Sequence, residues 1–520
     1  MPVSLPFSHC CCIWALPHRR ERRTGCLLHE RTGMPVTADI GATAQLYTPT
    51  KPDSRLRAGI LPGRNGASAW LLDCCARAMR LPFVEPLQDS SGSVADILID
   101  PVCDGDIDLQ NWMDGTDLPV LGILRVERCL TGTGVSDLLL AHQTFDIEVR
   151  LYRTRAGGRG ISPDGEIIYR SFESFQLSVH EERNVRAVDE ASATCLARAL
   201  RRLHAGCRPF APETGGEPVG RCGGRGWLYR ARRLAVSVKG NIDARSGGSR
   251  WVLAWRWAAA GDLPGFEENS IAAAPFRLVE LPDDGEAADP FAVMHDGGLY
   301  LFFERVPPGG ARGELACAVF DEGRLRDVRE VMVQPFHLSY PQVFEAEGDW
   351  WMIPETGEVK RVDLYRAEHF PDRWIRERTL LEGHSMVDAT VHRKDGLWYM
   401  MVTVDEGGFH REWALFVFMA ETLRGPWRPH PLNPVRSDVR DTRGAGPLFE
   451  HRGRLLRPAQ DGSRGYGSSL TFQHVTELSP QGYAEERITS FRPDNMGPIR
   501  GCHTFSQAGG MQFIDIRVKR

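Results

Sequence analysis

The strongest constraint on the fold is a plan that recurs along the second half of the chain. In the stretch DPFAVMHDGGLYLFFE, Asp289 to Glu304, an acid and a proline precede two alternating apolar runs that flank a glycine turn. Four later stretches follow the same plan: SYPQVFEAEGDWWMIPE, VDATVHRKDGLWYMMVT, AGPLFEHRGRLLRPAQD and CHTFSQAGGMQFIDI. Aligned at Pro290, Pro341, Ala389, Pro447 and Thr504, they are separated by 51, 48, 58 and 57 residues. This period is typical of four-stranded blades, so the sequence predicts an all-β five-bladed propeller over residues 226–520.

The repeat suggests a reason for the acid that opens the first stretch. The innermost strand of each blade lines the central channel, so residues at one register of successive strands meet at one mouth of that channel. Asp289 and Asp388 hold the same register in the first and third repeats. We therefore expect them at a shared site. The alternative is that each aspartate caps backbone donors where a strand begins.

The region before the repeats has a different pattern, in which strands alternate with helices. Short β-like runs cover Arg55–Leu61, Ala95–Asp100 and Leu118–Val126, and apolar residues recur at helical spacing over Ala67–Pro82 and Val188–Leu203. This alternation predicts a small, doubly wound α/β domain over residues 56–205. The PGRNG loop after the first strand lacks the glycine spacing of a nucleotide-binding loop, which favours a tight turn.

Two segments have no hydrophobic periodicity that would predict a helix or a strand. Residues 1–55 are interpreted as a disordered, dispensable lead, with Met34 as an alternative start of translation. Residues 206–225 are dense in glycine and proline and are expected to be a linker between the two domains.

Charge and cysteine content narrow the classes of partner. A net charge of -5 gives no global attraction to nucleic acid, and no run approaches the ~20 apolar residues that a membrane helix needs. The 13 cysteines include no CxxC pair, which favours reduced thiols over zinc ligands or a disulfide framework. The sequence therefore predicts a cytoplasmic protein without a membrane span, a nucleic-acid partner or a cofactor.

The α/β region resembles the formyltransferase-like domains of bacterial sugar-modifying proteins, through its strand–loop–helix opening and the closing stretch FESFQLSVHEERNVRAVDEASATCLARALRRL. The resemblance implies a catalytic Asn-x-His motif, but Asn111 is followed by Trp112 and Met113. The domain is therefore interpreted as a degenerate member of that family.

The repeats carry a second resemblance, which covers residues 226–520. The DP, VDAT and GP motifs resemble those of the five-bladed propellers of glycoside hydrolase family 43. The longer strings PFHLSYPQVFEAEGDWWMIPET, LYRAEHFPDRW, LRGPWRPHPLNPV and GRLLRPAQDGSRGYG are similar to the N-terminal domain of plant glucosamine inositolphosphorylceramide transferases.

The family 43 resemblance implies roles for particular carboxylates. Asp289 would be the general base, and Asp388 would orient and tune the pair. The family's proton donor is a glutamate in an EGP stretch, where this chain has Ala445. Glu355 and Glu304, at matching ends of inner hairpins, are alternative donors. Hydrolysis by the standard arrangement is therefore not predicted.

Other polar residues lie at strand ends and suit sugar binding. The predicted substrate-binding set is Glu304, His337, Tyr340, Arg457, Gln460, Asp461 and His503. Arg457 and Asp461 would satisfy either each other or a polyol ligand. His503 or His337 could hold a cation, but a histidine at a strand start more often bonds to backbone, so no metal is predicted.

Two classes of function stay open. One is a carbohydrate-active enzyme, hydrolase or transferase, with chemistry around Asp289, Asp388 and Glu355. The other is a non-catalytic glycan-recognition or scaffold protein of polysaccharide or glycolipid biosynthesis. In both cases the expected partners are a glycan or sugar-containing small molecule and glycosyltransferases of the same pathway.

Overall fold

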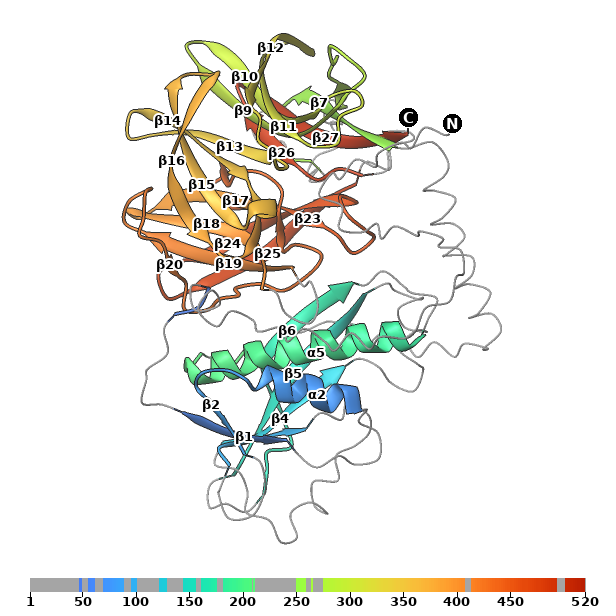
Figure 1. The fold of residues 1–520 in the computed structure, drawn as a ribbon, viewed down its shortest axis with the longest axis vertical. Coiled ribbons are helices and arrows are strands. Elements are labelled where there is room, and N and C mark those ends of the chain that lie inside the picture. Colours follow the sequence, from blue (N-terminus) through green and yellow to red (C-terminus); the bar gives the residue numbers. More distant parts are fainter. Residues whose placement is uncertain are drawn as a thin grey trace, which may run out of the picture.

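The computed structural model describes fourteen stretches of the chain. They are residues 46–48, 55–60, 69–87, 95–100, 121–128, 144–155, 160–174, 181–207, 209–210, 249–258, 263–264, 275–406, 413–492 and 501–519. The predicted linker lies almost wholly outside these residues, as does the PGRNG loop. Figure 1 shows an α/β domain below a propeller.

The α/β domain is built on one mixed sheet, with strand order β2-β1-β3-β4-β5-β6. Its strands are β1 (Leu56–Ile60), β2 (Val84–Pro86), β3 (Ile97–Asp100), β4 (Gly122–Arg128), β5 (Thr144–Arg153) and β6 (Glu166–Ser174). Strands β1 to β4 pair in parallel, whereas β5 and β6 are antiparallel. The prediction of parallel strands is confirmed for the first part of the sheet. The β5–β6 hairpin was not predicted.

Two described helices, α2 (Ala69–Ala78) and α5 (Glu181–His204), pack on this sheet and on each other. Apolar residues at helical spacing, such as Cys74, Val188 and Cys195, are buried against the strands. The predicted helices are confirmed. Because the two helices contact each other, they share one face of the sheet, and the doubly wound arrangement stays a prediction.

The propeller consists of five sheets around one axis, as predicted. Blade one contains β9 (Glu286–His295), β10 (Gly298–Val306), β11 (Glu314–Asp321) and β12 (Arg324–Met332). Blade two contains β13 (Ser339–Ala346), β14 (Asp349–Glu355), β15 (Arg361–His369) and β16 (Arg373–Glu382), with the 3-10 helix η1 (Gly357–Val359). Blade three contains β17 (Ser385–Lys394), β18 (Leu397–Asp405), β19 (Trp413–Ala420) and β20 (Arg428–Pro429).

Blade four contains β21 (Arg443–Gly444), β22 (Phe449–His451), β23 (Arg454–Asp461), β24 (Ser469–Leu478) and β25 (Tyr483–Phe491). Blade five joins the two ends of the propeller: β26 (Phe505–Ala508) and β27 (Met511–Lys519) pair with β7 (Ser249–Trp257) and β8 (Arg277–Leu278). The long β27–β7 pairing closes the ring.

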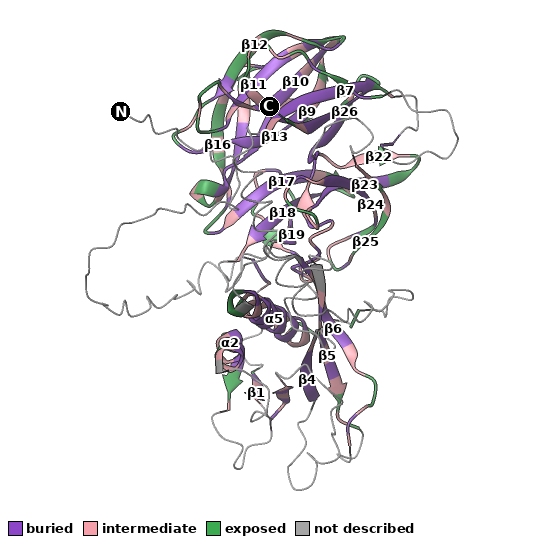
Figure 2. Ribbon diagram, turned by 90° about the vertical axis from the view of Figure 1, so that its right-hand side faces the viewer, coloured by how far each residue is buried: buried purple, intermediate pink, exposed green. Residues whose placement is uncertain are grey.

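Apolar clusters fill the wedges between neighbouring blades. Figure 2 colours the buried parts of the strands purple. Trp351 and Trp398, for example, are buried in the cluster that joins blades two and three. This confirms that bulky aromatics of the repeats pack between blades.

Part of the predicted lead is packed against both domains. Leu46 and Tyr47 are 2% and 8% exposed and belong to the apolar cluster of blades two and three. The Tyr47 hydroxyl donates to the Glu406 carboxylate, and the Arg201 guanidinium stands 4.0 Å from the centre of the Tyr47 ring. The interpretation of residues 1–55 as a dispensable lead is therefore wrong at these positions.

Candidate functional site

Three innermost strands share an unusual backbone feature at one register. Asp289, Tyr340 and Asp388 have φ angles of 51°, 47° and 55°, in the left-handed region that non-glycine residues rarely adopt. At each of them the hairpin pairing shifts, so that two residues of the inner strand oppose one of its neighbour. Such bulges re-aim a side chain, and strained residues of this kind gather at functional sites.

The Asp289 carboxylate is surrounded by donors from two other blades. One of its oxygens accepts the Thr504 hydroxyl at 2.5 Å, and the other accepts the backbone N–H of Tyr340 at 3.1 Å. The side chain is almost fully buried, with 6% of the residue exposed. Asp289 therefore joins blades one, two and five at the start of the innermost strands.

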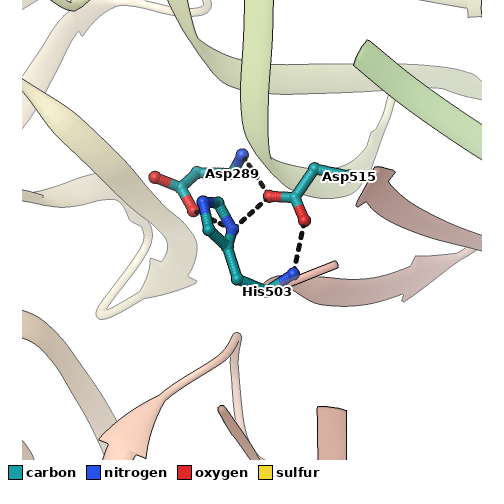
Figure 3. Close-up of side chains that lie close together, drawn as sticks. All are labelled: Asp289, His503 and Asp515. Atoms are coloured by element: carbon teal, nitrogen blue, oxygen red, sulfur yellow. Dashed lines mark hydrogen bonds and ion pairs between the residues drawn. The ribbon is translucent and has the colours of Figure 1, made fainter. Parts of the chain in front are cut away.

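His503 and Asp515 complete this cluster (Figure 3). The His503 Nδ1 lies 2.5 Å from Asp515 Oδ2 and 3.5 Å from Asp289 Oδ1. Asp515 also accepts the backbone N–H groups of Asp289, His503 and Thr504 at 3.0, 2.8 and 3.0 Å. Ligand atoms of the three side chains lie within 4.8 Å of one another, a spacing that could hold a metal ion. In the geometry described here, the imidazole itself bonds to Asp515.

The pKa values of Asp289 and Asp515 are shifted in opposite directions. Burial raises the pKa of Asp289 to about 6, and the carboxylates of Asp515 and Asp388 add to this while His503 opposes it. Although burial works against both charges, the Asp515 pKa is lowered by His503, and the His503 pKa is raised by the two carboxylates. The pKa of Asp289 therefore lies near 6, whereas the lowered pKa of Asp515 and the raised pKa of His503 both favour the charged forms of that pair.

The second aspartate belongs to an adjoining ion-paired group. Arg443 Nε donates to Asp388 Oδ2 at 2.6 Å, and its Nη2 lies 3.9 Å from Glu355 Oε2. Gln460 Nε2 contacts the same Asp388 oxygen at 3.4 Å and donates to the Gly444 carbonyl at 2.9 Å. Asp388, Glu355 and Gln460 were predicted for the site, whereas Arg443 was not.

Tyr340 connects the two groups. Its N–H bonds to Asp289, and its hydroxyl accepts the Gly446 N–H at 2.6 Å and lies 2.9 Å from the Thr390 hydroxyl, two residues beyond Asp388. The predicted convergence of Asp289 and Asp388 thus has a physical link, and the Asp388 charge is one cause of the raised Asp289 pKa.

Aromatic rings stand beside the polar groups. Trp251 stacks on the His503 ring with centroids 4.1 Å apart, and Tyr466 meets the same ring at 5.3 Å. The Arg443 guanidinium lies 5.0 Å from the centre of the Tyr466 ring. Tyr466 is half-buried, so it is the ring of this group with an accessible surface.

Glu304 and His337 form a pair of their own between blades one and two. His337 Nε2 lies 3.4 Å from Glu304 Oε1, and its Nδ1 accepts the backbone N–H of Gly313 at 3.0 Å. Burial lowers the pKa of His337 to about 4, so this imidazole is neutral. A side chain at Gly313 would collide with both residues, which indicates tight structural packing.

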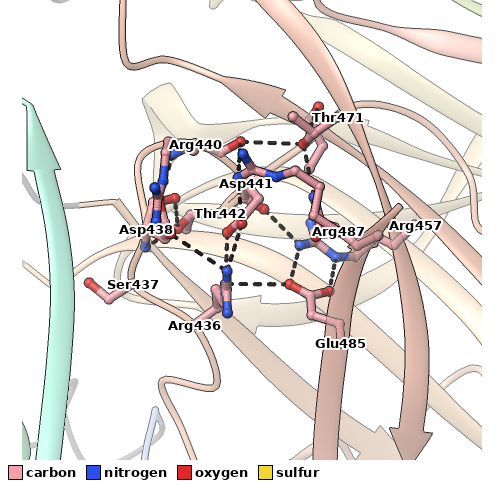
Figure 4. Close-up of polar contacts among 12 residues, drawn as sticks. Arg436, Ser437, Asp438, Arg440, Asp441, Thr442, Arg457, Thr471, Glu485 and Arg487 are labelled. Atoms are coloured by element: carbon pink, nitrogen blue, oxygen red, sulfur yellow. Dashed lines mark hydrogen bonds and ion pairs between the residues drawn. The ribbon is translucent and has the colours of Figure 1, made fainter. Parts of the chain in front are cut away.

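Arg457 and Asp461 have structural partners and do not pair with each other. Arg457 donates to both oxygens of Glu485, at 2.8 and 2.7 Å, within the charged network of Figure 4. Asp461 Oδ1 accepts the Ser463 N–H at 2.9 Å in a turn. Of the two alternatives for these residues, pairing with each other is wrong, and their described contacts are structural. Binding of a polyol ligand stays a prediction.

The position expected for a family 43 proton donor is apolar in its surroundings. Ala445 is fully buried in a cluster with Leu456, Phe472 and Phe505. Its backbone N–H and carbonyl bond to Pro458 and Phe505. The chain therefore lacks an acid at this position and also lacks polar space for one.

Two site residues were missed because their signals are weak. Asp515 interrupts the apolar run FIDI, and a lone acid in a buried central strand could have marked it. Arg443 lies in a two-residue strand with no periodicity, so the sequence gives no sign of it.

Sequence comparison finds relatives for the propeller. Residues 280–496 match one family model. That family is described as glucosamine inositolphosphorylceramide transferase 1, N-terminal. The match confirms the resemblance predicted for the propeller. It covers part of the predicted range 226–520.

Two curated plant proteins match part of the chain. The chain is 31% identical over 224 residues to glucosamine inositolphosphorylceramide transferase 1 of Arabidopsis thaliana, covering 42% of this chain and 29% of that protein. It is 32% identical over 203 residues to the protein of that name from Oryza sativa subsp. japonica, covering 38% and 27%. The chain thus spans less than a third of the length of these relatives.

Solved structures with similar folds include glycoside hydrolases. A family 117 glycoside hydrolase of Zobellia galactanivorans shares 13% identity at a TM-score of 0.33 and covers 52% of this chain and 90% of that one. The catalytic domain of a GH62 α-L-arabinofuranosidase from Coprinopsis cinerea shares 14% identity at a TM-score of 0.35. That match covers 51% of this chain and 97% of that one. At these scores the similarity carries no argument about activity.

The comparison also corrects the expected location. The matching relatives are glucosamine inositolphosphorylceramide transferases, and this finding contradicts the predicted cytoplasmic location. Reduced thiols and a mild net charge do not discriminate between compartments, and this is why the prediction failed.

Neither helix described in the structure combines the length and the apolar character needed to cross a bilayer.

Proposed function

We propose that the propeller binds a carbohydrate beside Asp289 and Asp388, and that it acts in the assembly of a polysaccharide or glycolipid. The observation that carries the proposal is the shared register of Asp289, Tyr340 and Asp388, three left-handed residues on successive inner strands. A fold keeps such strain, at about 1–3 kcal/mol per residue, when it positions side chains. The family match supports a carbohydrate-related role.

The chemistry of the surrounding residues suits a sugar. Hydroxyl groups bond to carboxylates, amides and guanidinium groups, and Asp388, Gln460 and Arg443 offer all three. The apolar face of a pyranose packs on an aromatic ring, and the half-buried Tyr466 stands next to Arg443. Asp388 and Glu355 both face Arg443, an arrangement suited to binding and orientation.

The test compares Asp289 of β9 with Asp296, which lies in the turn that follows this strand. Asp289→Asn removes the charge at the site, whereas Asp296→Asn removes an exposed charge at the other end of β9, where the backbone is also left-handed. Binding of the full chain to a panel of immobilised glycans, followed by calorimetry on each sugar retained, should fall at least tenfold for Asp289→Asn. It should be unchanged for Asp296→Asn. Equal binding by both variants would refute the proposal.

A second candidate is catalysis at the same residues, by a hydrolase or transferase. One observation favours it: the Asp289 pKa, raised to about 6 by burial, suits general acid or base chemistry near neutral pH. The absence of an acid at Ala445 counts against hydrolysis by the two-carboxylate arrangement. Turnover of a panel of aryl glycosides that is lost in Asp289→Asn would favour the enzyme, and binding without turnover would favour recognition.

For the α/β domain, we keep the hypothesis of a degenerate formyltransferase-like fold. Its support is the strand–helix pattern and the mixed sheet, and the catalytic Asn-x-His motif is missing at Asn111.

A further inference from the structure

The α/β domain docks on the propeller through one short segment of blade four, Arg436–Arg443, which we call the docking segment. Phe172 of β6 donates its N–H to the Ser437 carbonyl at 3.0 Å and accepts the Val439 N–H at 2.9 Å. These two bonds form a parallel bridge between the edge strand of one domain and the loop of the other. The Arg440 guanidinium covers the Phe172 ring at 3.8 Å.

Buried polar side chains reinforce this bridge. Ser171 Oγ lies 2.6 Å from Ser437 Oγ, and Arg198 Nη1 of α5 donates to the same Ser437 hydroxyl at 3.1 Å. Arg198 also pairs with Glu406, which receives the Tyr47 hydroxyl. Arg198 is 2% exposed, so this contact is dry and sensitive to the loss of a partner.

The interior of the docking segment is fixed by a network of charges (Figure 4). Arg436 donates to both oxygens of Asp441, at 2.8 and 2.7 Å, and Arg487 reaches Asp441 Oδ2 at 3.0 Å. The Asp438 N–H donates to the Thr442 hydroxyl at 2.7 Å, and this hydroxyl donates to the Asp438 carbonyl at 2.6 Å. The segment is therefore a rigid connection made of side-chain bonds, with little regular strand pairing.

The far end of the docking segment lies at the candidate site. Arg443 is five residues from Asp438, and it carries the guanidinium that bonds to Asp388. The strand that holds Arg443, β21, is two residues long. So short a strand places a side chain poorly without support from its flanks. On the N-terminal side that support comes from the charge network around Asp441 and from the docked domain, which holds Ser437 and Val439.

We propose that the α/β domain is a positioning element of the candidate site: by holding Ser437 and Asp438, it sets the position of Arg443 against Asp388 and Glu355. What the site binds rests on the proposed function, but the mechanical link does not. Undocking frees the docking segment, and Arg443 and its partner strands then lose order. The α/β domain thereby affects the site through the docking segment.

Hydrogen exchange of the full chain without any sugar tests this link. Ser437→Ala removes the hydroxyl bonds to Ser171 and Arg198, and Ser437→Thr restores a hydroxyl. Phe172→Pro removes the N–H that bonds to Ser437. This N–H points away from the sheet of the α/β domain, so the proline removes no hydrogen bond between β5 and β6. Ser479→Ala is the matched control, because it removes a hydroxyl bond to Gly482 in the same blade, away from the docking segment.

The expected result is selective. Amides of residues 443–446 and 388–391 should exchange about tenfold faster in Ser437→Ala and Phe172→Pro, the change that corresponds to roughly 1.4 kcal/mol of local stability. The amides of the turns at 395–396 and 452–453, at the other end of the blades, should keep their exchange rates. In Ser479→Ala and Ser437→Thr, the amides of residues 443–446 and 388–391 should keep their exchange rates as well. Faster exchange in the docking segment alone, equal loosening of every blade, or no change in either variant would each overturn the proposal.

The outcome is independent of the proposed function. If exchange at the site responds and no glycan is bound, the positioning role stands and the sugar proposal falls. If glycans bind and exchange at the site does not respond, the reverse holds.

Discussion

The Arg443 guanidinium and the Asp388 carboxylate, 2.6 Å apart, bring blades three and four together at the candidate site. Both side chains are shielded from water, with 15% and 3% of their surface exposed. A buried pair of this kind contributes little net stability, but the loss of one partner leaves an uncompensated charge.

We therefore expect Arg443→Ala to lower the free energy of unfolding by about 2–4 kcal/mol. Arg443→Lys should cost less, since it keeps the charge and loses the planar fork of donors. The double variant Arg443→Ala with Asp388→Asn should be more stable than the sum of the single changes predicts. Urea unfolding of the parent, of Arg443→Ala, Arg443→Lys and Asp388→Asn, and of the double variant measures this, and strict additivity would show that the pair is not coupled.

The Asp289 cluster predicts a dependence of stability on pH. The pKa of Asp289 is raised by burial to about 6, above the value near 3.8 of an unfolded chain. Between these values the native state binds the extra proton, so this residue favours folding at low pH and its contribution is lost as pH rises through 6. Asp515, with its lowered pKa, acts in the opposite direction and contributes stability at higher pH.

Asp289→Asn isolates the first effect. Relative to the parent chain, this variant should gain stability as pH rises from 5 to 7.5, by about 1.4 kcal/mol, because most of the proton is lost from the native state over this range. Asp296→Asn, which alters an exposed carboxylate, should follow the parent at every pH. Urea midpoints of the three chains at pH 5, 6 and 7.5 measure the difference. A difference that stays constant across this range would contradict the raised pKa.

The packed part of the N-terminal segment predicts a third effect. Tyr47→Ala removes a ring from the cluster of blades two and three and deprives Glu406 of a donor, so we expect a loss of about 3 kcal/mol. Tyr47→Phe keeps the ring and should lose about 1 kcal/mol. A chain that starts at Pro52 should melt earlier than one that starts at Met34, which retains Tyr47. Identical melting of both chains would restore the interpretation of a dispensable lead.

The sequence predicted the propeller because its signal is local and repeated. Each hairpin has its own alternation of apolar residues and its own turn. Aligning the five copies shows which residues occupy equivalent positions in successive blades. That register placed Asp289 and Asp388 correctly on inner strands. Asp515 was not predicted because its strand, β27, takes its place through pairing with β7, which lies more than 250 residues earlier in the chain.

Other misses have the same long-range origin. Arg457 looked like a ligand residue because it precedes Gln460 and Asp461, yet it turns to Glu485 on the neighbouring strand. Alternate residues of a strand face opposite sides, and a short polar run does not say which side faces the channel. Tyr47 was assigned to the lead because a three-residue contact leaves no periodicity in a sequence.

The last prediction concerns Ala445, where a glutamate would match the acid of family 43. By the family 43 resemblance alone, a glutamate at this position would supply the missing proton donor. The structure predicts the opposite, because the residue is fully buried among Leu456, Phe472 and Phe505. A carboxylate there has no polar partner among these neighbours, so the variant should lose several kcal/mol of stability and show no glycosidase activity. Ala445→Met serves as a control for volume: it should be less destabilised than the glutamate variant, since overpacking alone costs about 1–3 kcal/mol. Thermal melting and aryl glycoside turnover of both variants decide the matter, and a stable, hydrolytic Ala445→Glu protein would mean that position 445 opens to the site.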